Sequence, residues 1–364
     1  MKFVKTEDLK VGMRLARPIY NKQGVLLFER DSKLMPQTIT SVEKFGLLGV
    51  YILEPTEPLM PMSEEDIEFE RFQTVTVFSL QEELELILDT KHHRGLLSIA
   101  GSIIKQYGHM DTRRHFYQNL RSREDFVYKH SMNVAILSTM IAHTMNAHIK
   151  DLTQAVYASL LHDIGKISFY KNKKDAKELL IPGEAEKLFE QQISRLDILE
   201  TAFADGAMLR CICRQAAMAQ KDLNEGVAYR GKLLLPSKIL LVANRYDEIT
   251  AMRMNDSNSD SEVRAIKEFM AHPEIYDPKV VDALIKSIYI LFPGVSVELN
   301  TGEKGLIIAE NPFDILRPVL LGFADNSIID LSQKANSDIE IVDVMKTLDN
   351  RYVIDTASLE RAGI

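Results

Sequence analysis

Residues 160–166 read Leu-Leu-His-Asp-Ile-Gly-Lys, and this stretch is the most informative part of the sequence for predicting the fold. An apolar helix delivers His162 and Asp163 side by side, and we expect Gly165 to end that helix in a tight turn. An imidazole nitrogen and a carboxylate oxygen from adjacent residues suit one divalent cation. The stretch therefore predicts a metal site at the end of a helix.

Two further segments supply side chains that fit the same site. His130 lies near the start of an amphipathic helix expected over residues 127–145, and it approaches His162 if the two helices pack antiparallel. Asn244 and Asp247 stand three apart on a helix expected over residues 233–252, so they share one surface. The predicted metal ligands are therefore His130, His162, Asp163 and Asn244.

The hydrophobic pattern around this site predicts a mainly α fold. Residues 67–290 show apolar side chains three and four apart with few Gly or Pro, which is typical of stacked helices. Residues 1–66 predict a small α+β module plus a linker, and residues 291–364 predict a β-rich tail with a short antiparallel meander and a terminal helix or strand. In the first module the expected elements are strands over 13–20, 25–28 and 49–53 and a helix over 36–45.

Charge and composition exclude several classes of protein. The formal net charge is -8 and Lys and Arg are not clustered, so general nucleic-acid binding is not expected. No stretch reaches the roughly 18 apolar residues of a membrane span, and the first residues lack the apolar core of a secretion signal. The only cysteines, Cys211 and Cys213, are too close together for a strain-free bridge. We therefore expect a cytoplasmic protein that does not bind membranes.

The order of these motifs resembles the HD superfamily of metal-dependent phosphohydrolases, and specifically its HD-GYP branch. The resemblance rests on His130, on His162-Asp163-x-Gly-Lys, and on Val-Ala-Asn-x-Tyr-Asp-x-Ile-Thr at residues 242–250. It implies an HD-type helical bundle over residues 80–290, and a family activity, hydrolysis of cyclic di-GMP at a centre of two or three metals. It also implies that His130, His162 and Asp163 are metal ligands and that Lys166 is the lysine of the family's turn.

The chain departs from this family pattern at several positions. Asn244 stands in place of the last aspartate, Phe126 stands where the family has a Glu, and Gln191 and Gln192 stand where it has a His. The family's His-His-Glu and Gly-Tyr-Pro signature falls at residues 214–218 and 226–231, which contain neither motif. A two-metal hydrolase holds its cations about 3.5–4 Å apart. Without these ligands we expect at most one divalent cation (Mn, Fe, Mg or Ni) and no second or third metal site.

Phosphate contacts are less clearly indicated. Lys166 suits a catalytic or phosphate-binding role beside Asp163, and a lysine after a helix-ending Gly is equally favourable because it faces the helix C-terminus. Arg230 and Arg253 are candidates for an anion pocket. Exposed arginines usually form weak surface ion pairs, and that interpretation is favoured for both.

Two classes of function stay open. The first is a signalling protein with a degenerate HD site, which binds a nucleotide, a cyclic dinucleotide or a protein partner without hydrolysing cyclic di-GMP. The alternative is a phosphohydrolase with a single metal that acts on a nucleotide or cyclic dinucleotide, with Asp163 and Lys166 as catalytic residues. Sequence alone leaves open whether the chain is an enzyme and whether it forms a homodimer.

Overall fold

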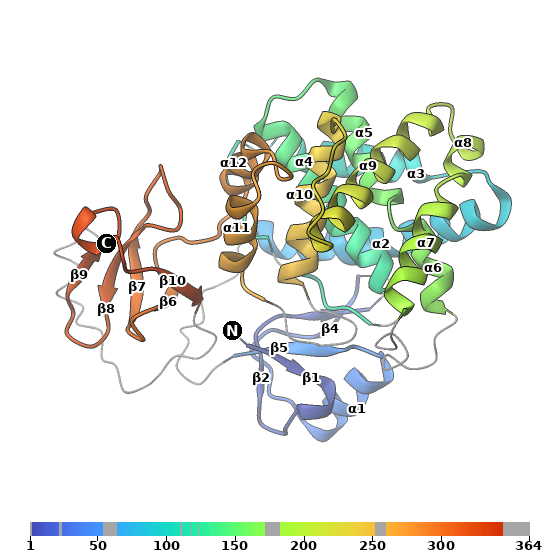
Figure 1. Ribbon diagram of the computed structural model, residues 1–364. Coiled ribbons are helices and arrows are strands. Elements are labelled where there is room, and N and C mark those ends of the chain that lie inside the picture. Colours follow the sequence, from blue (N-terminus) through green and yellow to red (C-terminus); the bar gives the residue numbers. More distant parts are fainter. Residues whose placement is uncertain are drawn as a thin grey trace.

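The computed structural model describes residues 2–21, 24–53, 64–109, 111–116, 118–122, 124–171, 183–251 and 260–344. The fold is mainly α, as predicted, with a small N-terminal sheet module and a C-terminal antiparallel sheet. Figure 1 shows the helices as the largest body, with the N-terminal module beneath them and the C-terminal sheet at one side. Among the described helices, none is both long and apolar enough to cross a membrane.

The helical domain is a bundle packed around one long helix. Its helices are α2 (Glu64–Thr90), α3 (Leu96–Tyr107), α4 (Phe126–Thr144), α5 (Ile149–Leu161), α6 (Ile164–Lys171), α7 (Glu184–Arg195), α8 (Ile198–Ala202), α9 (Gly206–Asn224), α10 (Leu235–Thr250), α11 (Glu262–Ala271) and α12 (Pro278–Ser287). Helix α4 is at the centre, because α2, α3, α5, α10 and α12 all pack against it. Its residues 130–142 are buried on every side, as expected of a helix without a solvent face.

The turn between α5 and α6 differs from the prediction. Helix α5 ends at Leu161, and His162 and Asp163 form the turn, so Gly165 is already inside α6. The prediction that Gly165 ends the helix is wrong. A Cβ atom at position 165 would lie 2.7 Å from the carbonyl oxygen of Gln191, so Gly is required because α7 packs closely against α6.

The N-terminal module has its own small core. Strands β1 (Lys2–Lys5), β5 (Gly49–Leu53) and β2 (Arg14–Leu15) form one antiparallel sheet in the order β1-β5-β2. Strands β3 (Ile19–Tyr20) and β4 (Leu26–Phe28) form a separate pair, and helix α1 (Pro36–Lys44) precedes β5. The single strand predicted over residues 13–20 is therefore wrong: it is two strands in two sheets, separated at Pro18, which has no N–H to donate.

The C-terminal meander has five strands in the order β10-β6-β7-β8-β9. Their bounds are β6 (Ser296–Leu299), β7 (Lys304–Ala309), β8 (Val319–Gly322), β9 (Ile328–Asp330) and β10 (Ile341–Val344). The antiparallel meander was predicted; the return of β10 to the outer edge of β6 was not. The buried side chains of this sheet are continuous with the helical core, and β10 packs near α11. The predicted terminal helix or strand beyond residue 344 lies outside the described residues.

Candidate metal centre

Two helices and one turn bring the four predicted ligands to one point. His130 projects from the first turns of the central helix α4, His162 and Asp163 occupy the turn after α5, and Asn244 lies on α10. The donor atoms of His130, His162 and Asp163 all lie within 4.8 Å of one another, and all three residues are buried. The packing of α4 against α5 therefore brings His130 close to His162 and Asp163, as the sequence predicted.

The ring nitrogens of the two histidines are already assigned by their neighbours. Nδ1 of His130 lies 2.6 Å from a carboxylate oxygen of Asp247, and Nδ1 of His162 lies 2.8 Å from the carbonyl oxygen of Ser159. Both neighbours accept hydrogen bonds and donate none, so in each neutral ring the proton sits on Nδ1. In this neutral form each Nε2 carries a lone pair, which is the form that binds a metal.

These lone pairs converge on one space together with an amide oxygen. The two Nε2 atoms are 3.2 Å apart, and each lies 2.9 Å from Oδ1 of Asn244. The amide nitrogen of Asn244 points the other way and donates to Glu248 at 3.1 Å. Donor atoms bound about 2.1 Å from a common cation lie roughly 3.0–3.4 Å apart. The spacing therefore fits the coordination shell of one divalent cation.

Asp163 supplies the negative charge of this group. One of its oxygens lies 3.4 Å from Nε2 of His162 and the other 3.7 Å from Nε2 of His130. Burial would raise the pKa of this carboxyl group, but the basic groups of His162, Lys166 and His130 outweigh burial and lower the pKa to about 2. Burial is the main cause that lowers the pKa of His162. Asp163 is therefore ionised and His162 neutral near pH 7, which suits cation binding.

One oxygen of Asp163 is engaged by protein donors as well. Nζ of Lys166 lies 2.9 Å from Oδ1, and Nε2 of Gln192 donates to the same atom at 2.8 Å. Gln192 also donates to the carbonyl oxygen of His162 at 3.3 Å. Gly165 makes this contact available, because it lets α7 approach the turn that carries Asp163.

A buried polar network holds His130 from behind. Asp247, which is fully buried, accepts from His130 at 2.6 Å, from Arg121 at 2.6 and 2.8 Å, and from Asn133 at 2.8 Å. Burial would raise the pKa of Asp247, but Arg121 and His130 outweigh it and hold the pKa well below its usual range. Carboxylates that accept the second ring proton of a metal-binding histidine fix its orientation.

The remaining predicted residues are Lys166, Arg230 and Arg253. Lys166 forms an ion pair with Asp163 and lies in the first turn of α6, so the interpretation that it follows a helix end is wrong. Arg230 is exposed in the segment after α9, and Arg253 lies outside the described residues. The ring of Phe126 lies under the guanidinium of Arg121 at 5.1 Å from its centroid and faces Tyr170.

Sequence reasoning missed the residues that support the ligands. Arg121 and Asn133 carry no motif, Gln192 was noted only as a replacement for a family histidine, and Asp247 only as a neighbour of Asn244. A signal existed for one of them: Asn133 lies three residues after His130 and directly before the apolar run of residues 134–137 on the same helix. A polar side chain in such a place requires partners.

Comparison with known proteins agrees with this geometry. Residues 127–243 match the HD domain family, and this range contains His130, His162 and Asp163 and ends one residue before Asn244. A cyclic di-GMP phosphodiesterase from Pseudomonas aeruginosa is 25% identical over 268 residues, covering 68% of this chain. The alignment spans only 59% of the length of that relative. No solved structure matches the chain. The family match and this distant similarity support membership of the chain in the HD superfamily.

Proposed function

We propose that the chain is an HD-superfamily signalling protein whose site takes one divalent cation and binds a nucleotide or cyclic dinucleotide without hydrolysing cyclic di-GMP. The cation would be held by His130, His162, Asp163 and Asn244, whose donor atoms converge on one space. When bound, a divalent cation supplies positive charge that polarises a phosphate group. The amide of Asn244 contributes an oxygen but no charge, so we expect weaker binding than with a second carboxylate beside Asp163.

The observation that carries the proposal is the environment of Asp163. A bridging aspartate must offer one oxygen to each of two cations. Here Oδ1 is engaged by the ammonium of Lys166 at 2.9 Å and by Gln192 at 2.8 Å. A positive charge that already sits beside this oxygen disfavours a second cation there. The two-cation clamp that stabilises both the attacking and the leaving oxygen of a phosphodiester is therefore not expected.

The side chains themselves can still orient an anionic ligand. The ammonium of Lys166 donates to Asp163, so a phosphate that reaches Asp163 also meets this positive charge. Asp163 and Asp247 are held ionised by their neighbours, and the two histidines are held with their lone pairs towards the site. A signalling protein that does not turn over its ligand must pass the signal on by binding another protein. The proposal therefore includes a protein partner or a second copy of this chain.

The test measures binding and hydrolysis of cyclic di-GMP by the full chain after reconstitution with Mn²⁺. Calorimetry is expected to show saturable binding that is lost in His162→Ala, while chromatography shows no linear product over hours. His143→Ala is the matched control, because His143 lies away from the site and pairs with Asp111 at 3.2 Å. Turnover that His162→Ala abolishes and His143→Ala retains would overturn the proposal, as would the absence of binding.

A phosphohydrolase with a single metal is the second candidate. It is favoured by one observation: the donor set for one cation is complete and stands next to Lys166. One bound cation can polarise a phosphate and activate water. A screen of nucleoside mono- and triphosphates with the same three proteins distinguishes the candidates, because only this one predicts phosphate release that depends on His162.

A further inference from the structure

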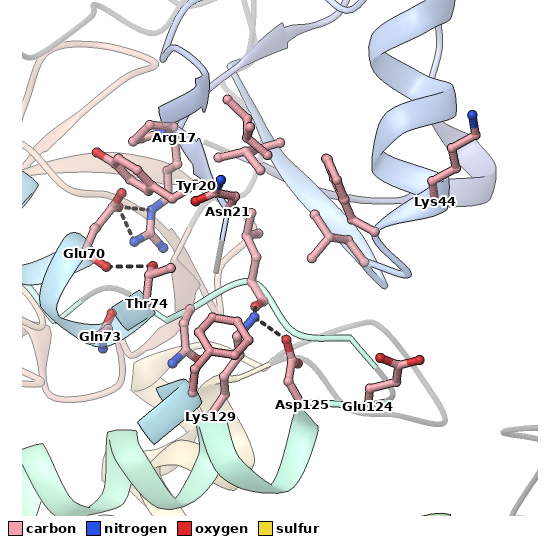
Figure 2. A pocket seen from close by; sticks show the side chains of 18 residues that line it. Arg17, Tyr20, Asn21, Lys44, Glu70, Gln73, Thr74, Glu124, Asp125 and Lys129 are labelled. Carbon is pink, nitrogen blue, oxygen red and sulfur yellow. Dashed lines mark hydrogen bonds and ion pairs between the residues drawn. The ribbon is translucent and has the colours of Figure 1, made fainter. Parts of the chain in front are cut away.

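A cavity of about 390 Å³ lies between the N-terminal module and the helical domain, away from the cation ligands. Figure 2 shows its wall: Glu70, Gln73 and Thr74 come from α2, Arg17, Tyr20 and Asn21 from the N-terminal module, and Asp125 and Lys129 from the start of α4. The volume falls in the range of small-molecule sites, about 300–1,000 Å³. Two separately folded parts therefore close around a space of ligand size.

The charges in this wall cancel within the protein. Arg17 forms a buried ion pair with Glu70, and Lys129 pairs with Asp125 at 2.6 Å. Lys44 and Glu124, the other two charged residues in the lining, are exposed and of opposite sign. A ligand with a net charge would have to compete with these pairs, so the cavity suits an uncharged molecule.

Two of the uncharged polar side chains in the wall, Gln73 and Thr74, present hydrogen-bond acceptors. Gln73 is 1% exposed, and its amide nitrogen donates to Asn133 at 3.0 Å, as does the amide nitrogen of Asn119. Within the described parts of the chain, Oε1 of Gln73 accepts no hydrogen bond. The hydroxyl proton of Thr74 is used on the carbonyl of Glu70 at 2.9 Å, which leaves its oxygen as an acceptor. Both oxygens can accept hydrogen bonds from the donors of a ligand.

Most of the rest of the wall is apolar or aromatic, and the further polar groups are the amides of Asn21 and Asn119 and the hydroxyl of Tyr20. Tyr20, Phe45 and Phe78 line the cavity together with leucine, isoleucine and proline side chains of both parts. Aromatic walls with a few placed polar groups are typical of sites for flat rings. The aromatic wall and the acceptors together suit a planar ring with N–H groups along one edge.

We propose that this cavity is a binding site for an uncharged planar heterocycle whose edge donates N–H hydrogen bonds, the chemistry of an amino-substituted nucleobase. This inference does not depend on the function of the cation site. The two are nevertheless connected, because Gln73 bonds Asn133, Asn133 bonds Asp247, and Asp247 bonds His130. A ligand held by Gln73 is thus three hydrogen bonds from a predicted metal ligand.

The test uses guanosine as the probe, with saturation-transfer NMR on the full chain. Guanosine offers N–H donors on an uncharged flat ring; caffeine is a purine of similar shape without any N–H donor and serves as the control ligand. We expect saturable guanosine binding and at least about tenfold weaker caffeine binding, equivalent to about 1.4 kcal/mol. No saturable guanosine binding, or equal binding of the two, would overturn the proposal.

Variants locate the binding in this cavity. Thr74→Phe fills the space from α2, and Ile67→Phe adds the same ring at an exposed position of the same helix outside the lining. Thr74→Phe is expected to abolish guanosine binding and Ile67→Phe to retain it. Tyr20→Ala removes a wall from the N-terminal module and is expected to weaken guanosine even if Thr74→Phe fails to fold. Binding that both Thr74→Phe and Tyr20→Ala retain lies elsewhere and contradicts the assignment.

Discussion

The buried carboxylate of Asp247 is the part of the site whose removal has the most predictable consequence. In Asp247→Asn the shape is kept, but the charge that faces Arg121 and His130 is lost. Arg121 is 1% exposed and would be left as an uncompensated buried cation. Breaking a buried ion pair by removing one partner costs about 3–5 kcal/mol. Since domains are stable by about 5–15 kcal/mol, the variant is expected to fold with much reduced stability.

Urea unfolding followed by circular dichroism, in the presence of EDTA, measures this loss as a fall in the transition midpoint. The matched control is Asp197→Asn, because Asp197 pairs with Arg210 on the surface at 2.8 Å and is 67% exposed. That variant is expected to leave the midpoint unchanged. A loss below about 1 kcal/mol in Asp247→Asn would refute the reasoning, because it would mean that Arg121 finds water or another partner.

The same variant tests the role of Asp247 behind His130. Loss of a partner that orients a metal-binding histidine typically weakens metal binding by about 10–100-fold. We expect a weakening of this size for Mn²⁺ in Asp247→Asn, measured by calorimetry at a temperature where the variant is folded. Unchanged Mn²⁺ affinity would show that the tautomer of His130 is set in another way.

Three further predictions follow from single contacts. Gly165→Ala is expected to lower the free energy of unfolding by about 1–3 kcal/mol in urea unfolding, because the new Cβ would meet the backbone of α7 at 2.7 Å. The control Gly101→Ala, in an open helical position, is expected to raise the free energy of unfolding by about 0.5–1 kcal/mol. Asn244→Asp adds a second carboxylate to the ligand set and is expected to tighten Mn²⁺ binding at least about tenfold in calorimetry. An equal effect of the exposed change Asn146→Asp would contradict a local cause. Burial would raise the pKa of Asp277, but hydrogen bonds from a lysine side chain and from the backbone lower it. The ionised carboxylate of Asp277 therefore stabilises the fold above the unfolded pKa of about 3.9, and this stabilisation is lost as pH falls through the lower folded pKa. The stability difference between the wild type and Asp277→Asn is therefore expected to shrink below about pH 4 in thermal unfolding, and a constant difference would contradict this assignment.

Much of the fold could be predicted because local patterns decide it. The helices around the site follow from apolar residues three and four apart, and the convergence of His130 with His162 follows from the antiparallel packing of neighbouring helices. The sequence failed where a distant segment overrides a local signal. Gly165 resembles a helix end, but it is needed for the approach of α7, which no local pattern announces.

The supporting network could not be predicted for a similar reason. Asp247, Asn133, Arg121 and Gln118 come from three separate segments, and only the packed bundle brings them into one hydrogen-bonded group. Polar residues of this kind have no fixed spacing in sequence. Their presence in a buried helix indicates that partners exist but not which ones.

Elemental analysis of protein purified without chelator tests the central claim most directly. The wild type and His143→Ala are expected to carry about one divalent metal per chain after loading with Mn²⁺, and His162→Ala and Asp163→Ala to carry none. Two metals per chain that both depend on Asp163 would contradict the single-cation site, because Oδ1 of Asp163 would then have to exchange Lys166 and Gln192 for a second cation. No metal in any of the four proteins would equally contradict the claim that the converging donor atoms form a cation site.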